Sequence, residues 1–227
     1  MLILFSKRLF VAVTVVITLC SAPGEAAEPA LTQNPKPRGD IRIVYVSDAD
    51  SDARSVLPEN ATADHLRAHI DVLASCGVDF YAQDVFQKHG VCWFWPEHPD
   101  HAHFAGQVDK IPRADGPPIK IAVEQCHKLG IKFLPVFRMA DRHDGGQQGL
   151  IARRQDLWNP DFGDAAMDYT HDEIRDWVFE LVEEIVRRFD VDGFEFTYTR
   201  WMHCFPKSKA RESHPIMTKF LRHVLGR

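Results

Sequence analysis

The sequence lacks the short motifs that mark several large enzyme classes. Its 227 residues contain no glycine-rich phosphate-binding loop, no Gly-x-Ser-x-Gly nucleophile elbow and no Cys-x-x-Cys pair. These motifs bind phosphate groups, expose a nucleophilic serine and carry dithiol redox chemistry, respectively. The sequence therefore gives no support for any of those three functions.

An excess of positive charge is also absent. The 27 Lys and Arg residues are outnumbered by 32 Asp and Glu residues, which gives a formal net charge of −5. Residues 1–26 hold two basic side chains and one acidic side chain, so the remaining chain carries −6. A mildly acidic protein argues against nucleic acid as the main partner. No run of basic residues indicates a patch that binds a membrane surface.

Cysteine is scarce, and its spacing matches no compact disulfide scaffold. Four of the five cysteines, at positions 76, 92, 126 and 204, follow residue 26. Cys76 and Cys126 fall near predicted helix ends or faces, where a buried free thiol is the more common arrangement. We therefore expect free thiols, and the sequence leaves disulfide pairing open.

The N-terminus has the pattern of a secretory signal peptide. Lys7 and Arg8 precede an apolar run at residues 9–20, which is too short to span a bilayer comfortably. Gly24 and Ala26 place small residues at positions −3 and −1 of a cleavage site after Ala26. We expect residues 1–26 to be the signal peptide, residues 27–40 to be a linker and the mature protein to be secreted or periplasmic, with no membrane attachment.

Residues 41–227 alternate between strand and helix patterns. Residues 41–46, 78–85, 131–137 and 190–200 are predicted strands, and residues 62–77, 117–130, 170–189 and 214–226 are predicted helices. This order predicts an α/β fold with a parallel sheet. A complete (β/α) barrel of TIM type needs about 250 residues. We therefore expect a barrel truncated to about four βα units, whose open sheet edges favour self-association.

Local signals define several of these elements. Thr62 is an expected N-cap, and Gly77 and Gly130 are expected to follow helix ends. Thr170 and Glu173 have the spacing of a capping box. The apolar run at residues 41–46 is typical of a strand that is buried on both faces.

The strand at residues 190–200 carries an acidic residue among aromatic ones. Phe194, Phe196 and Tyr198 alternate with Glu195, Thr197 and Thr199. If helices cover the aromatic face, Glu195 points to the barrel interior. A buried carboxylate needs a partner or a function. We expect Glu195 either to be an acid/base residue or to form a structural ion pair with Arg138 or Arg200.

The long loops that follow the second and third strands extend over residues 86–116 and 138–169. Loops after strands build the active face of a (β/α) barrel. The second of these loops brings Asp141 and Asp144 close to a strand end. Glycoside hydrolysis uses two carboxyl groups, so either aspartate is a candidate partner of Glu195. The alternative is a solvated charged loop.

Aromatic residues near these loops are candidate sugar-binding side chains. Trp93, Trp95 and Trp201 present apolar faces of the kind that stack on sugar rings. The alternative is that they pack beneath the loops. The histidines at positions 89, 98, 101 and 103 match no zinc motif. We expect no metal and no cofactor.

The strand-end motifs resemble a known family. The run at residues 137–144, Phe-Arg-Met-Ala-Asp-Arg-His-Asp, and the run at residues 189–195, Phe-Asp-Val-Asp-Gly-Phe-Glu, are similar to glycosyl-hydrolase-like TIM-barrel proteins. These belong to the family 10-like group of exported bacterial proteins. Further similar segments lie at residues 158–160, 167–169 and 173–176, and the resemblance covers about residues 41–206. Thr197 and Ala140 stand where the family usually has Asp and Asn, and the family barrel continues through four more strands.

The resemblance implies carbohydrate chemistry at the strand ends. It implies that Glu195 is the acid/base, that Asp141 or Asp144 is the second carboxylate, and that Arg138, His143 and Arg200 hold the substrate. One alternative is a non-catalytic, carbohydrate-binding remnant of the barrel. Another is a metal-dependent hydrolase that uses the histidines between positions 89 and 103.

Overall fold

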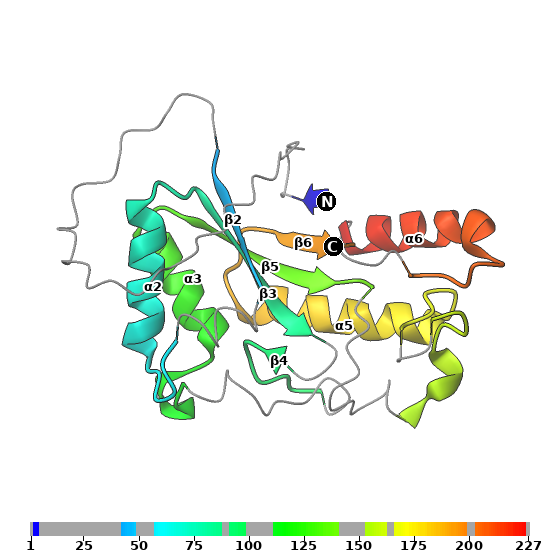
Figure 1. The fold of residues 1–227 in the computed structure, drawn as a ribbon, viewed down its shortest axis with the longest axis horizontal. Coiled ribbons are helices and arrows are strands. Elements are labelled where there is room, and N and C mark those ends of the chain that lie inside the picture. The colour runs from blue at the N-terminus through cyan, green and yellow to red at the C-terminus, as the bar shows by residue number, and fades with distance from the viewer. Residues whose placement is uncertain are drawn as a thin grey trace.

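The computed structural model describes residues 2–4, 42–48, 57–87, 91–98, 111–140, 153–162, 166–198 and 203–225. Figure 1 shows a sheet with α-helices packed along it. Four βα units follow one another: β2 (Val44–Ser47) and α2 (Ala63–Ser75), β3 (Phe80–Gln87) and α3 (Pro118–Lys128), β5 (Lys132–Arg138) and α5 (Asp172–Arg188), β6 (Phe194–Thr197) and α6 (Ala210–Leu225). Two short strands, β1 (Leu2–Leu4) and β4 (Val91–Cys92), complete the sheet.

The sheet has the strand order β1-β6-β5-β3-β2, with β4 paired to β3. The strands β2, β3, β5 and β6 are parallel to one another, whereas β1 runs antiparallel to β6 and β4 runs antiparallel to β3. Parallel strands joined by helices are the repeating unit of a TIM barrel. The predicted α/β class with four βα units is therefore confirmed.

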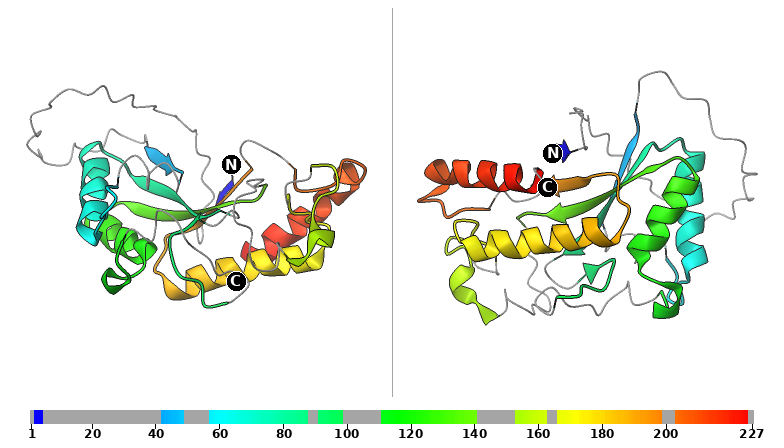
Figure 2. Two further views of the ribbon diagram at one scale, coloured as in Figure 1. Left: turned by 60° about the horizontal axis from the view of Figure 1, so that its bottom comes forward. Right: turned by 180° about the vertical axis from the view of Figure 1, so that it is seen from behind.

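The α-helices pack on one face of this sheet, as both views in Figure 2 show. Tyr81 of β3 packs edge-on against Phe133 of β5, with ring centroids 5.5 Å apart, and Phe86 meets Trp177 of α5 at the same distance. On β6, Phe196 contacts Phe220 of α6. A smaller apolar cluster of Ala82, Leu134 and Val136 lies on the other face. The aromatic side of β6 thus faces helices, as the alternation predicted.

Helix boundaries follow the capping signals at two helices. Thr62 is the N-cap of α2, where its side chain and that of His65 satisfy backbone groups reciprocally. Gly77 follows the C-cap of that helix with φ 78°, and Gly130 follows α3 with φ 74°. Only glycine adopts this left-handed conformation without strain. Both expected helix ends are therefore confirmed.

The predicted capping box at Thr170 and Glu173 is wrong. The N-cap of α5 is His171, and its side chain makes no capping hydrogen bond. Instead, the Thr170 N–H donates to Asp168 Oδ1 at 2.8 Å, and Arg154 donates to the Glu173 carboxylate at 3.3 Å. Asp168 takes the backbone donor that the capping box needs, so the helix begins one residue later.

Two other local predictions also need correction. Strand β2 is not buried on both faces: Val46 is 43% exposed, and among the described strands β2 is the last of the sheet and pairs with β3 alone. Helix α6 begins at Ala210, four residues earlier than predicted, and includes Pro215.

The cysteine predictions are partly confirmed. Cys76, Cys126 and Cys204 are free thiols. Cys126 and Cys204 are buried, and burial raises the pKa of each thiol to about 12. Cys76 is exposed rather than buried because it is the C-cap of α2 at the surface end of that helix.

The predicted signal peptide and linker lie outside the described residues, except for residues 2–4. Among the described residues, no helix has the length and apolar content that crossing a membrane requires.

Candidate functional site

A row of polar residues crosses the sheet on the face that carries no α-helix. Asp84 of β3 is in register with Val136 of β5, and Val136 is in register with Glu195 of β6. Two residues further towards the carboxyl ends of these strands, Arg138 is in register with Thr197. Residues paired in adjacent parallel strands point to the same face. The register therefore places Asp84, Arg138 and Glu195 on one surface near the carboxyl ends of three strands.

Glu195 is the most buried acidic residue of this row. The residue is 1% exposed, and its Oε2 atom has no hydrogen-bond partner among the described residues. Burial raises the pKa of this carboxyl group to about 7, because removal from water disfavours the charged form. A carboxyl group whose pKa is raised this far keeps part of its protonated form at neutral pH.

Arg138 forms ion pairs that connect the ends of three strands. Its Nε lies 2.7 Å from Asp84 Oδ2, and its Nη2 also forms an ion pair with Asp48, which directly follows β2. Side-chain exposures are 13% for Arg138, 3% for Asp84 and 23% for Asp48. Buried charges are tolerated where they are paired and hydrogen-bonded. The three charges thus hold the ends of β2, β3 and β5 in a fixed arrangement.

The expected structural pairing of Glu195 with Arg138 is not seen in the described part of the chain. The Arg138 guanidinium instead contacts Asp48 and Asp84. Burial is the first cause of the raised pKa of Glu195. Among the described residues, the two charged groups on neighbouring strands therefore have opposite environments.

Several predicted site residues lie outside the described residues: Asp141, His143, Asp144, Arg200 and Trp201. The residues just before Asp141 are described. The Met139 N–H donates to the Thr197 carbonyl at 3.0 Å, so the loop that leads to Asp141 starts hydrogen-bonded to the end of β6. Glu195 is two residues from that point. The Asp141 segment therefore begins next to the Glu195 strand.

The structure separates two predicted sugar-binding tryptophans from this row. Trp93 is 1% exposed and belongs to the main apolar core on the helix side of the sheet. Trp95 is half-buried: its ring lies beneath the Arg113 guanidinium at 4.9 Å, and its carbonyl accepts a hydrogen bond from Arg188 of α5. Packing beneath the loop, the alternative given above, describes both residues. We leave them out of the proposed site.

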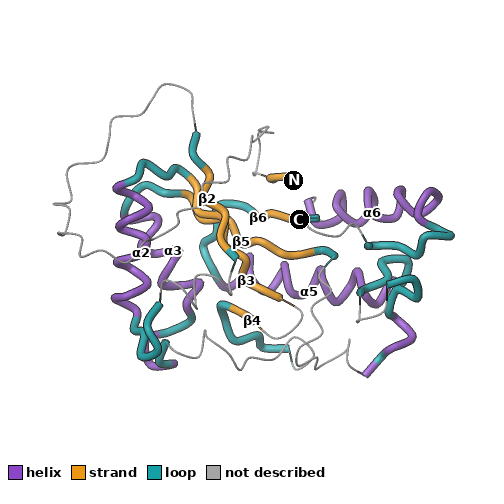
Figure 3. Tube along the Cα trace, viewed as in Figure 1, coloured by secondary structure: helices purple, strands orange, loops and turns teal. Residues whose placement is uncertain are grey.

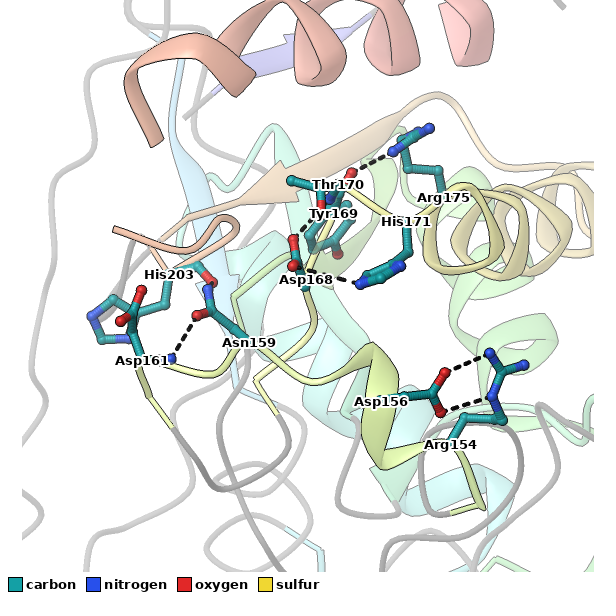
Figure 4. Close-up of polar contacts among 10 residues, drawn as sticks. All are labelled: Arg154, Asp156, Asn159, Asp161, Asp168, Tyr169, Thr170, His171, Arg175 and His203. Carbon is teal, nitrogen blue, oxygen red and sulfur yellow. Dashed lines mark hydrogen bonds and ion pairs between the residues drawn. The ribbon is translucent and has the colours of Figure 1, made fainter. Parts of the chain in front are cut away.

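The described part of the loop after β5 is folded by its own polar contacts, which Figure 4 shows. Asn159 is fully buried: its Nδ2 donates to the His203 carbonyl at 3.1 Å, and its Oδ1 accepts the Asp161 N–H. Trp158 and Met167 form an isolated antiparallel bridge. The two short motifs at residues 158–160 and 167–169 are therefore neighbours in space.

This loop meets the segment that follows β6. The Tyr169 N–H donates to the Cys204 carbonyl at 2.9 Å, and the His203 ring stacks on Phe162 at 3.4 Å. Figure 3 shows these loop segments together at one end of the molecule, beyond the ends of β5 and β6. Acidic residues in this loop serve the fold: Asp156 binds Arg154, and Asp168 lies 3.6 Å from His171.

No group of three or more metal-binding side chains is present in the described ranges. His98 is described, whereas the histidines at positions 89, 101 and 103 lie outside those ranges. The predicted metal-dependent alternative therefore has no geometric support from the described residues.

Sequence reasoning missed Asp48 and Asp84. Asp84 carried a usable signal, since it is a carboxylate near the carboxyl end of the second predicted strand. Asp48 follows the first strand, at the same end of the sheet. Their shared partner Arg138 is 54 residues or more away in sequence, and local patterns do not reveal such a long-range ion pair.

Comparison with known proteins shows the fold. No family model matches the chain, and no curated protein sequence matches it. Among solved structures, it is similar to the α-amylase of Geobacillus thermoleovorans in complex with acarbose, with a TM-score of 0.50, 14% identity, and coverage of 81% of this chain and 43% of that one. A putative α-amylase from Salmonella typhimurium has a TM-score of 0.49, 18% identity, and coverages of 81% and 29%.

A hypothetical protein from Ruminiclostridium thermocellum is also similar, with a TM-score of 0.49, 14% identity, and coverage of 72% of this chain and 88% of that one. The chain spans less than half of either α-amylase. Its fold is thus the α/β fold of glycoside hydrolases with a TIM barrel.

Proposed function

We propose that this chain is an exported, carbohydrate-active protein of glycoside-hydrolase type in which Glu195 is the general acid. One observation carries the proposal: Glu195 is buried on the face without α-helices, and its pKa is raised to about 7. A carboxyl group that protonates a leaving glycosidic oxygen at neutral pH needs a raised pKa of this kind. The resemblance to the family 10-like group supports the same role.

The second carboxylate in this proposal is Asp141 or Asp144. Both follow the turn that is hydrogen-bonded to the end of β6. Arg138, His143, Arg200 and Trp201 would contact the sugar, since their charges and aromatic ring suit hydroxyl groups and apolar ring faces. The mature protein would begin after Ala26 and act outside the cytoplasm.

A non-catalytic sugar-binding protein is the second candidate. The observation in its favour is that Asp48 and Asp84, the other carboxylates at this end of the sheet, are already ion-paired with Arg138. A carboxylate bound to arginine is less available as a nucleophile or base. Such a site would bind sugar through its fixed charges without cleaving it.

Hydrolysis assays on the purified chain separate the two candidates. Soluble starch is a suitable first probe, because the α-amylase of Geobacillus thermoleovorans has a similar fold. The first candidate predicts hydrolysis that Glu195→Gln lowers by a factor of about 100 or more. The matched control is Glu124→Gln, an exposed glutamate on α3 that should leave the rate unchanged.

Two outcomes decide against the first candidate. Hydrolysis that survives Glu195→Gln would remove Glu195 from the chemistry. Sugar binding measured by isothermal calorimetry, with no hydrolysis by wild type or by Glu195→Gln, would support the non-catalytic candidate. Hydrolysis abolished by a chelator would instead support a metal-dependent reaction.

The proposal also includes association of the chain with itself through an open edge of its sheet once the predicted signal peptide is removed. A strand at a sheet edge presents backbone groups that pair with another strand.

A further inference from the structure

The outer edge of β6 is held by the N-terminal end of the chain itself. Residues Leu2–Leu4 form β1, which pairs antiparallel with β6 in the register Leu2 with Phe196, Ile3 with Glu195 and Leu4 with Phe194. Figure 1 shows β1, in blue, beside β6, in orange. The edge beside Glu195 is therefore an acceptor for an antiparallel strand, and the segment that occupies it belongs to the predicted signal peptide.

The hydrogen-bond pattern identifies which backbone groups this edge offers. The Thr197 carbonyl accepts the Met139 N–H, so the backbone groups of Thr197 face β5. Successive residues of a strand direct their N–H and C=O groups to opposite edges. Glu195 therefore also faces β5, and Phe194 and Phe196 present their N–H and C=O groups to the outer edge. These are the residues that β1 pairs with.

Removal of the signal peptide would expose these groups. The outward-facing N–H and C=O groups of Phe194 and Phe196 would then have no strand to pair with. Unpaired backbone groups in such a position favour pairing with another strand. The pairing with β1 shows that this edge accepts a strand that runs antiparallel to β6.

We propose that, once residues 1–26 are removed, the outer edge of β6 pairs with β6 of a second copy of this chain. A two-fold axis makes the paired strands antiparallel by symmetry. In the register that pairs the outward-facing residues of the two copies, Phe194 of one copy lies opposite Phe196 of the other. It also places the two Glu195 residues opposite each other, so the dimer brings two copies of the proposed site to one continuous sheet.

This inference rests on the proposed removal of the signal peptide and not on carbohydrate chemistry. The hydrolysis result for Glu195→Gln therefore leaves it unaffected. Conversely, an association result does not change the assignment of Glu195. The two proposals fail separately.

The test uses the full chain with a single substitution in β1. Leu4→Pro removes the N–H that faces Phe194 and so releases the edge. Leu4→Val is the matched control, since valine favours strands and keeps the N–H. Hydrogen exchange of the Phe194 and Phe196 amides reports edge pairing, and sedimentation equilibrium reports the oligomeric state. Far-UV circular dichroism checks that Leu4→Pro is folded.

The wild-type chain and Leu4→Val are expected to be monomers with protected Phe194 and Phe196 amides at every concentration. Leu4→Pro is expected to dimerise, with exchange of these two amides about tenfold or more slower in the dimer than in dilute solution. A folded Leu4→Pro protein that remains monomeric would overturn the proposal. Assembly beyond the dimer would also overturn it, because a two-fold contact is closed.

Discussion

At the residue scale, two neighbouring charged groups on the sheet face have opposite environments. Arg138 is paired with Asp48 and Asp84, whereas burial raises the pKa of Glu195 to about 7. Ionisable groups with perturbed pKa values cluster at functional sites. We therefore propose Glu195 as the proton donor and Arg138 as a fixed cation of the site.

The raised pKa of Glu195 predicts a pH-dependent cost in stability. A free glutamate has a pKa of 4.5, whereas burial raises the pKa of Glu195 in the folded protein to about 7. Between these values the unfolded chain releases a proton that the folded chain retains, so stability falls as pH rises through this window. Glu195→Gln should therefore be more stable than wild type at pH 8, by on the order of 3 kcal/mol. Urea unfolding of both proteins at pH 8 and pH 4 checks this prediction. It would be contradicted if Glu195→Gln and wild type had equal free energies of unfolding at pH 8 as well as at pH 4.

The ion pairs of Arg138 predict a large effect on stability from a single substitution. Arg138→Met leaves the Asp84 carboxylate, with 3% side-chain exposure, without its partner. Removing one member of a buried ion pair costs about 3–5 kcal/mol. Arg42→Met is the control, because Arg42 is 63% exposed in its pair with Asp79 and should cost less than about 1 kcal/mol. Equal losses in the two variants would show that Arg138 is not a structural anchor.

At the element scale, the sequence predicted the position of each parallel strand and helix but not each boundary. The helix ends at Gly77 and Gly130 were predictable because the left-handed conformation requires a particular residue type. The capping box at Thr170 and Glu173 failed because Asp168 and Arg154, at two different distances in sequence, bind the same groups. A local motif predicts a contact only where no other residue competes for it.

Helix α6 shows such a competing contact at Pro215. Proline has no N–H, so the Arg211 carbonyl four residues earlier lacks its helical donor. The His214 ring takes that place, with Nδ1 2.8 Å from the Arg211 carbonyl oxygen. This side-chain contact lets the helix begin at Ala210 although a proline follows, which the sequence pattern did not indicate.

Pro215→Ala should therefore stabilise the protein. Alanine restores the N–H and removes the ring from the helix interior, where proline costs about 3 kcal/mol relative to alanine. We expect a gain of about 1–3 kcal/mol, measured as a rise in the thermal midpoint at pH 7. His214→Ala in the wild-type background is the control and should lower the midpoint slightly. A lower midpoint for Pro215→Ala would show that the proline is favourable in this first part of α6.

At the scale of the whole molecule, the alternation of strands and helices predicted the architecture. It gave the parallel order of β2, β3, β5 and β6 and the inward direction of Glu195, because one face of β6 is aromatic. It did not predict the burial of Trp93 or the pairing of Arg138 with Asp84, since both depend on which distant segments meet. Periodicity reports which face a residue occupies, and tertiary packing decides what that residue contacts.

The position of β1 is another property of the whole molecule. Residues that the sequence pattern assigns to a signal peptide add a strand to the edge beside Glu195. Removal of that peptide would change the edge of the sheet and the surroundings of the proposed site at the same time.

The most direct test of the proposed proton donor is a titration of the Glu195 side chain. Carboxyl carbon signals of glutamate-labelled wild-type protein are followed by NMR from pH 3 to pH 9, and Glu195→Gln identifies the signal that disappears. A titration midpoint near 7 is the predicted result, which leaves the group able to donate a proton at neutral pH. A midpoint at or below about 4.5 would contradict the proposal, because Glu195 would then be a permanently charged carboxylate.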